Sequence, residues 1–295
     1  METYTISDFN NDFPDDDTCL DYIKNRRWPD GVHCEKCGQV RKHHRVTGRT
    51  AYACDYCGNH VYPLAGTIFE KSTTSLKHWL YAMYLMGQTR CGISAKQIER
   101  ETGVTYKTAW RMFKQIRSLM ADDITLEGSS VEADESYYGG KDKNRHANKK
   151  FGSRGRGNTG KTAVFGMVER KGRVIAKVVP TVGEATLLPI IKEKILPESM
   201  IYTDEHFAYN KLQSQGYQHK RVHHASKVYV MGDAHTNTME GFWSLTKRGI
   251  DGVHHSVSAK YLQTYLNEYG FRYNRRNDET PIFDSILSRA CLSED

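Results

Sequence analysis

With 295 residues, the chain is long enough for two or three domains, one of them with a substantial buried core. Hydrophobic residues make up 38% of it and charged residues 26%, and no apolar run approaches the roughly 20 residues that a membrane span needs. The composition therefore excludes a membrane-spanning helix, and the net charge of +7 favours a polyanionic partner.

Residues 1–30 form an acidic N-terminal segment, which opens METYTISDFNNDFPDDD. An acidic start does not resemble a secretory or transit peptide, so we expect a cytoplasmic protein.

Residues 31–70 predict a zinc ribbon. Four of the seven cysteines form two CxxC pairs separated by sixteen residues, Cys34 with Cys37 and Cys54 with Cys57. This spacing is typical of a four-cysteine zinc site, and a redox pair or disulfide is the alternative. So short a segment cannot bury enough apolar surface alone, so we expect Zn²⁺ to stabilise it. Four nearby histidines could substitute as ligands, although four thiolates already complete a tetrahedron: His33, His43, His44 and His60.

Residues 71–122 predict a helical DNA-binding region. A buried helix is expected over residues 75–86, Ser94 caps a short helix, and Thr105 caps a longer helix that ends at Met120. Two helices joined by a glycine-containing turn match the helix-turn-helix motif, although ordinary helical bundles contain similar pairs. The second helix would direct four residues at DNA: Tyr106, Lys107, Thr108 and Arg111.

Residues 123–295 predict an α/β catalytic domain whose mixed sheet is flanked by helices. We expect strands at 129–137, at 199–203 and at 218–222, a hairpin over 162–179, and helices at 184–195, 235–248 and 258–272.

A basic loop interrupts this domain at residues 139–161. Its segment 141–161 carries a net charge of +7, which equals the excess of the whole chain. A polyanion is the natural partner of such a strip, and a solvated surface loop is the alternative. The residues expected to contact DNA are Lys141, Lys143, Lys149, Lys150, Arg154 and Arg156.

Three carboxylates are the candidate catalytic residues. Asp134 and Asp204 lie on strand segments with similar surroundings, ADESYYGG and TDEHFAY. Two carboxylates from neighbouring strands repel each other, and a divalent cation that relieves the repulsion creates a metal site. Glu240 lies on a helix whose face it shares with Lys247, so this helix could ligate metal and, through Lys247 and Arg248, hold a DNA phosphate.

These segments resemble the DDE transposase and integrase superfamily, and within it the insertion-sequence transposases of the ISXO type and the related Merlin elements. The resemblance rests on the zinc ribbon and on EADESYYGGK, YTDEHFAYNKL and HTNTMEGFWSLTKRGIDGVHHSVSAKYLQTYLNEYGFRYNRR. Thirty-five residues separate Asp204 from Glu240, which is the spacing of that superfamily. The resemblance implies an RNase H-like fold with Asp134, Asp204 and Glu240 as the catalytic triad, and Asn237 is the alternative to Glu240.

The resemblance also implies a function. We expect a bacterial, nucleoid-associated transposase that binds the terminal inverted repeats of its insertion sequence, cleaves the ends and joins the 3′-hydroxyls to target DNA. Mg²⁺ or Mn²⁺ would be the catalytic cofactor, since two such ions assist in-line phosphodiester cleavage. Synapsis of two ends implies a homodimer or a higher homo-oligomer. The rivals are a DNA-binding regulator or domesticated transposase, and a nuclease without strand transfer.

Overall fold

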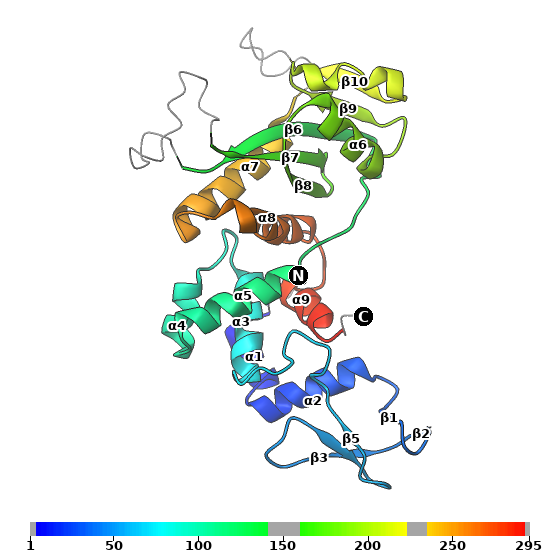
Figure 1. Cartoon of the computed structure of the whole chain (residues 1–295), viewed down its shortest axis with the longest axis vertical. Helices are drawn as coiled ribbons and strands as arrows, with labels where there is room; N and C mark the ends of the chain where they lie inside the picture. Colours follow the sequence, from blue (N-terminus) through cyan, green and yellow to red (C-terminus); the bar gives the residue numbers. More distant parts are fainter. Residues whose placement is uncertain (1–3, 141–159, 223–234, 293–295) are drawn as a thin grey trace. The chain divides into compact units, whose positions relative to one another are not determined.

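The computed structural model describes residues 4–140, 160–222 and 235–292, which divide into two compact units (Figure 1). Unit 1 comprises Met1–Thr89, Ile93–Leu119 and Asp278–Asp295, and unit 2 comprises Arg90–Gly92 and Met120–Asn277. Within the described ranges, no helix combines the length and the apolar composition that a membrane span requires.

Unit 1 contains the expected zinc ribbon. Its strands form a two-stranded sheet, β1 (His33–Cys34) with β2 (Gln39–Val40), and a three-stranded sheet, β3 (His43–Arg45), β4 (Tyr52–Cys54) and β5 (His60–Val61). All pairings are antiparallel.

The acidic segment before the ribbon, for which we predicted no structure, forms α1 (Ile6–Asp12) and α2 (Asp16–Arg27). Thr5 and Asp15 cap these helices with their side chains. Asp17 of α2 accepts a hydrogen bond from Arg45 of β3 at 2.7 Å, and Asp21 accepts one from the Tyr52 hydroxyl of β4. Acidic residues of α2 therefore hold this helix against the basic ribbon.

The rest of unit 1 is helical, with α3 (Leu76–Gln88), α4 (Ala95–Thr102), α5 (Tyr106–Ser118) and α9 (Ile282–Ala290). The expected helix starts are confirmed, because Ser94 accepts the Gln97 backbone N–H at 3.2 Å and Thr105 accepts that of Thr108 at 3.3 Å. Gly103, between α4 and α5, has a φ of +73°, the left-handed conformation that a glycine adopts without strain.

One boundary differs from the sequence-based expectation. We placed residues 278–295 in the catalytic domain, but α9 packs against α3 within unit 1. Phe283 of α9 lies among the rings of Tyr4 and Phe9, with centroid distances of 5.4 and 5.9 Å. The sequence does not reveal this change of unit, because the apolar face of an amphipathic helix does not indicate which hydrophobic core the helix packs against.

Unit 2 is built on a five-stranded mixed sheet in the order β10-β9-β6-β7-β8 (Figure 1). Its strands are β6 (Ser130–Tyr138), β7 (Thr162–Glu169), β8 (Val174–Val179), β9 (Met200–Thr203) and β10 (Gln218–Arg221). β7 runs antiparallel to both β6 and β8, whereas β9 is parallel to both β6 and β10. The expected α/β architecture with a mixed sheet is confirmed.

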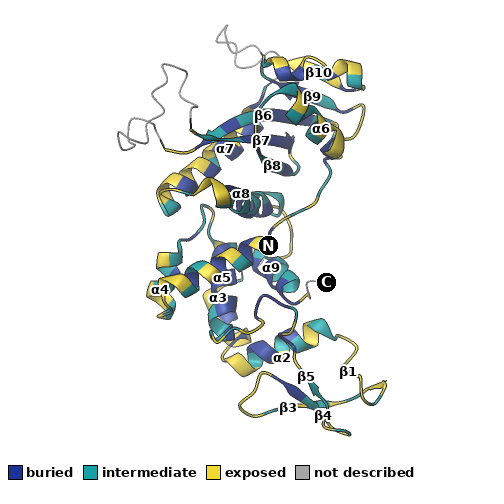
Figure 2. Ribbon diagram, in the orientation of Figure 1, coloured by how far each residue is buried: buried dark blue, intermediate teal, exposed yellow. Residues whose placement is uncertain are grey.

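Helices cover both faces of this sheet. On one face α6 (Glu184–Lys194) packs Leu187 and Ile191 against Val131 and Phe165. On the other face α7 (Asn237–Gly249) and α8 (Ala259–Asn274) pack against residues of β6, β7 and β8. The central strands β6, β7 and β9 are largely buried, whereas β10 is mostly exposed, and α7 turns an exposed side to solvent (Figure 2). Since side chains alternate along a strand, odd-numbered residues of β6 face α6 and even-numbered ones face α7.

Candidate active site

The two aspartates come from adjacent parallel strands. β6 and β9 pair in the register Val131 with Ile201 and Glu132 with Tyr202, and extending it by two residues sets Asp134 beside Asp204. Asp204 directly follows β9, and its Oδ1 accepts the backbone N–H of His206 at 2.9 Å. The expected meeting of two carboxylates at neighbouring strands is therefore present.

A third carboxylate, from Glu135, joins these two. Ligand atoms of Asp134, Glu135 and Asp204 all lie within 4.8 Å of one another. The Tyr209 hydroxyl donates to Glu135 and orients it. From the sequence, Glu135 is an acidic neighbour of Asp134 that could tune the site but has no assigned role, and strand alternation directs the two residues to opposite faces. The adjacent acidic pair in ADESYYGG was the only available signal.

The electrostatics of this cluster fit a site for a cation. The pKa of Asp134 is raised to about 6, chiefly by burial, and the negative charges of Asp204 and Glu240 contribute to this increase. The pKa of Glu135 is raised to about 7, again chiefly by burial, with the charges of Asp204 and Asp134 contributing to the increase. An all-carboxylate donor set of this kind suits a hard divalent cation such as Mg²⁺ or Mn²⁺, which would relieve the repulsion.

Glu240, the third candidate, lines the same cavity as Asp134. It lies in the first turn of α7, is exposed, and accepts a hydrogen bond from Thr236 Oγ1 at 3.3 Å. Glu240 is not part of the compact three-carboxylate cluster. It lines an open cavity of about 820 Å³ together with Asp134, Glu135, Ser136, Trp243, Ser244, Lys247, Arg248, Asp251 and Gly252.

The face of α7 that lines this cavity contains Glu240, Trp243, Ser244 and Lys247. The shared face of Glu240 and Lys247 is the one expected from helical spacing. Arg248 lines it as well. Asn237, the alternative to Glu240, is exposed in the same turn but does not line this cavity. Asp251 and Gly252 come from a π-helical turn, Ile250–His254, that continues α7.

Two further residues hold α7 against Asp134, and sequence reasoning gave neither a part in the site. Trp243 donates its indole N–H to Asp134 Oδ2 at 3.0 Å. Gly166 pairs with Asp134 across β6 and β7, and a Cβ atom there would lie 2.4 Å from both Met239 Cε and Trp243 Cζ2. Glycine therefore allows α7 to approach the sheet opposite Asp134. A glycine inside a predicted strand, in TAVFGMVE, was the available signal.

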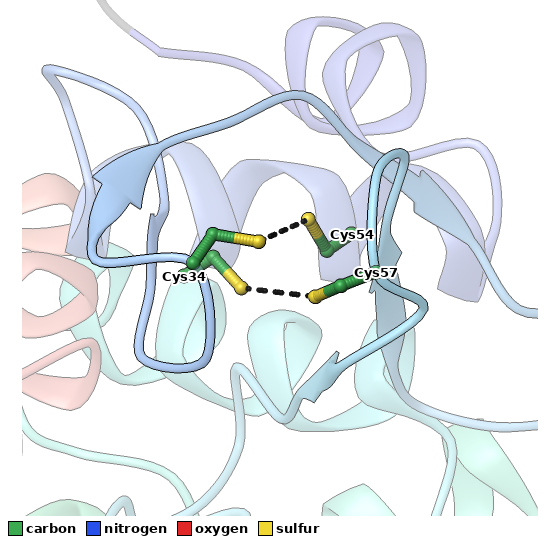
Figure 3. Close-up of side chains that lie close together, drawn as sticks. Cys34, Cys54 and Cys57 are labelled. Carbon is green, nitrogen blue, oxygen red and sulfur yellow. Dashed lines mark hydrogen bonds between the residues drawn. The ribbon is translucent and has the colours of Figure 1, made fainter.

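The four cysteines of unit 1 come together as expected (Figure 3). The sulfur atoms of Cys34 and Cys57 are 3.5 Å apart, and those of Cys37 and Cys54 are 3.9 Å apart. With Zn–S bonds of about 2.3 Å, sulfurs at the corners of a tetrahedron lie about 3.8 Å apart. The geometry therefore fits one zinc ion bound by four thiolates.

Apart from Lys247 and Arg248, which line the cavity, the residues expected to contact DNA fall into two groups. On α5, Tyr106, Lys107 and Arg111 are exposed and Thr108 is half-buried, while Arg111 donates to Ser72 Oγ at 3.3 Å. Most of the basic loop lies outside the described residues, including all six of its expected DNA contacts: Lys141, Lys143, Lys149, Lys150, Arg154 and Arg156.

Comparisons with known proteins define the class. Residues 125–274 match the ISXO2-like transposase domain, and residues 14–60 match the transposase zinc-ribbon domain. The second match begins before the expected ribbon boundary at residue 31 and takes in α2, which packs on the ribbon.

Two relatives agree with these matches. A protein in transposable element ISH50 of Halobacterium salinarum is 30% identical over 259 residues, which cover 83% of this chain and 86% of the relative. A transposase-like protein of Haemophilus influenzae is 33% identical over 119 residues, or 40% of this chain and 94% of the relative. The chain belongs to the ISXO2-like transposase family, as its motifs indicated.

Among the solved structures that align with the chain is a simian T-cell lymphotropic virus intasome in complex with PP2A regulatory subunit B56 gamma. The TM-score is 0.26 at 13% identity, with 72% of this chain and 64% of the other covered, which is too low to support a structural argument.

Proposed function

We propose that this transposase binds the terminal inverted repeats of its insertion sequence, cleaves the ends by metal-dependent hydrolysis, and joins the 3′-hydroxyls to target DNA. The observation that carries the proposal is the meeting of Asp134 and Asp204 on adjacent parallel strands, with Glu240 of α7 lining the cavity at Asp134. An RNase H-like fold is supported by the same arrangement, in which a five-stranded mixed sheet and the helix packed on it supply the acidic residues.

Asp134, Asp204 and Glu240 are the proposed ligands of Mg²⁺ or Mn²⁺, and Glu135 is close enough to assist. Bound at these carboxylates, two ions would activate the attacking hydroxyl and neutralise the leaving oxygen. Trp243 orients Asp134 through its indole N–H. Lys247 and Arg248, which line the same cavity, would bind the phosphates of the DNA strand and hold it against the carboxylates.

The remaining regions are proposed to find and hold DNA. The pair α4–α5, with its left-handed turn at Gly103, supports a helix-turn-helix whose second helix enters the major groove. The basic loop at 139–161 supplies positive charge for the backbone of DNA. Accordingly we assign DNA binding to residues 31–122 and catalysis to residues 123–277. Pairing two transposon ends requires at least a homodimer, and chromosomal DNA as substrate implies a cytoplasmic, nucleoid-associated protein.

A duplex made from the DNA that flanks the gene tests this function. In Mg²⁺ the protein should cut at the end of the inverted repeat and should join pre-cut 3′-hydroxyl ends to a second duplex. Specific binding without cutting would instead indicate a DNA-binding regulator. Cutting without joined products would indicate a nuclease that lacks strand transfer.

A further inference from the structure

Glu132, two residues before Asp134 on β6, has a fully buried side chain. Its Oε2 accepts the backbone N–H groups of Thr238 at 2.8 Å and Met239 at 3.0 Å, and its Oε1 accepts the Thr238 hydroxyl at 2.9 Å. Both backbone groups belong to the first turn of α7, where a helix has unsatisfied N–H donors.

The usual capping residue of α7 does not perform this task. Thr236 occupies the N-cap position, but its side chain makes no cap hydrogen bond and donates to Glu240 instead. A carboxylate from a neighbouring strand therefore supplies the cap, and its negative charge faces the positive end of the helix dipole.

The buried charge of Glu132 is also paired. Arg170, in the turn between β7 and β8, donates from Nε to Glu132 Oε1 at 3.0 Å and from Nη2 to the His235 carbonyl at 2.9 Å. The Arg170 guanidinium lies 3.9 Å from the centroid of the Tyr202 ring on β9. The network thus ties β6, β9 and the hairpin turn to the point where α7 begins.

Contacts between β6 and α7 continue along the same face of the strand. Trp243 bonds to Asp134, and the hydroxyls of Tyr138 and Thr246 are hydrogen-bonded. Glu132 makes the first contact of this series. Its partners Thr238 and Met239 lie in the same helical turn as Glu240, so Glu132 sets where α7 starts on the sheet. Because its two oxygens are occupied by protein donors and buried, Glu132 is not itself suited to bind metal.

We propose that Glu132 is a positioning residue, a buried carboxylate that fixes the first turn of α7 so that Glu240 and Trp243 meet Asp134. The inference rests on the proposed function of that site. A purely stabilising residue would affect only the stability of the fold. A positioning role requires that the order of the first turn of α7, and the metal concentration needed for cleavage, both depend on Glu132.

The test compares Glu132→Gln with Glu169→Gln. Glu169 on β7 is a matched control, since it is also buried and accepts three backbone N–H groups, from Glu127, Gly128 and Arg173, at 2.6–3.0 Å. None of these three residues belongs to α7. Both variants are expected to lower the melting temperature. Only Glu132→Gln should accelerate hydrogen exchange at the amides of Thr238 and Met239, which is measured without metal or DNA.

Glu132→Gln should also raise the Mn²⁺ concentration for half-maximal cleavage by about tenfold or more, the usual effect of removing a residue that supports metal ligands. Thr238→Val removes only one hydroxyl donor, so it should change hydrogen exchange and the Mn²⁺ requirement in the same direction but by less. This variant provides the test if Glu132→Gln fails to fold. The inference would be overturned if hydrogen exchange and the metal requirement changed equally in the Glu132 and Glu169 variants. It would also be overturned if neither quantity changed in Thr238→Val. A wild-type protein that never cuts DNA would contradict the proposed function, whereas the exchange result would still stand.

Discussion

The indole N–H of Trp243 on α7 donates to Asp134 Oδ2 on β6 at 3.0 Å, so the helix that carries Glu240 is bonded directly to the first candidate metal ligand. A hydrogen bond to a charged group contributes about 1.5–3 kcal/mol. Its larger consequence here is orientation, because the bond fixes which Asp134 oxygen remains available to a cation.

Replacing Trp243 with phenylalanine should therefore slow cleavage about 10- to 100-fold at saturating Mg²⁺ while the protein stays folded. Cleavage rates and thermal unfolding measure the two effects separately. Trp79→Phe is the control, because Trp79 is equally buried and donates its indole N–H to Ser72 Oγ at 3.1 Å in unit 1. Equal cleavage rates for the two variants would argue against a role for the Asp134 bond.

Gly166→Ala should disrupt the same contact from the opposite strand. Its Cβ would lie 2.4 Å from Trp243 Cζ2, and overpacking of this kind costs about 1–3 kcal/mol. We expect a lower melting temperature and slower cleavage. Gly241→Ala, on α7 with nothing within 4 Å of the added Cβ, should instead leave stability unchanged or raise it by up to about 1 kcal/mol. If Gly166→Ala and Gly241→Ala had the same effect on melting temperature and cleavage, the inference that α7 closely approaches β7 at Gly166 would be contradicted.

Zinc removal should unfold the ribbon. Elemental analysis is expected to find one zinc per chain, and Cys37→Ser should lose it, because three thiolates no longer complete the tetrahedron. Circular dichroism and limited proteolysis would show unit 1 opening while the sheet of unit 2 persists. Cys91→Ser is the control, as Cys91 lies outside the four-cysteine cluster. Full zinc content in the Cys37 variant would contradict the assignment.

Lys107 on α5 should contribute to DNA affinity. Lys107→Ala removes one exposed positive charge, so binding should weaken and the slope of log affinity against log salt should fall by about one. Lys192→Ala removes an exposed charge from α6 and should leave both quantities unchanged. Fluorescence anisotropy at several salt concentrations measures them, and an identical response of the two variants would remove α5 from the DNA interface.

The sequence predicted those features that depend on local periodicity. Short extended or apolar runs located the strands of unit 2, helical spacing placed Glu240 and Lys247 on one face of α7, and CxxC spacing predicted the cluster of four cysteines. Each of these signals is contained in a short stretch of chain, so no knowledge of tertiary packing was needed.

Features that depend on distant parts of the chain escaped prediction. Glu135 joins Asp134 and Asp204 although alternation directs it to the other face, and its carboxylate accepts a hydrogen bond from Tyr209, a residue more than seventy positions away in the sequence. Glu132 caps a helix that begins more than a hundred residues later. The acidic helices α1 and α2 gain their partners from the ribbon and from α9, so their own composition suggested no fold.

The most direct test of the central claim is metal-dependent cleavage by carboxylate variants, with DNA affinity measured in parallel. Asp134→Asn, Asp204→Asn and Glu240→Gln should bind the terminal-repeat duplex as tightly as the wild type but yield no detectable cleaved product in Mg²⁺, whereas Asn237→Ala should still cut. The account would be contradicted if the Asp134 or Asp204 variant cleaved at the wild-type rate. If Asn237→Ala lost cleavage while Glu240→Gln remained active, Asn237 rather than Glu240 would be the third catalytic residue.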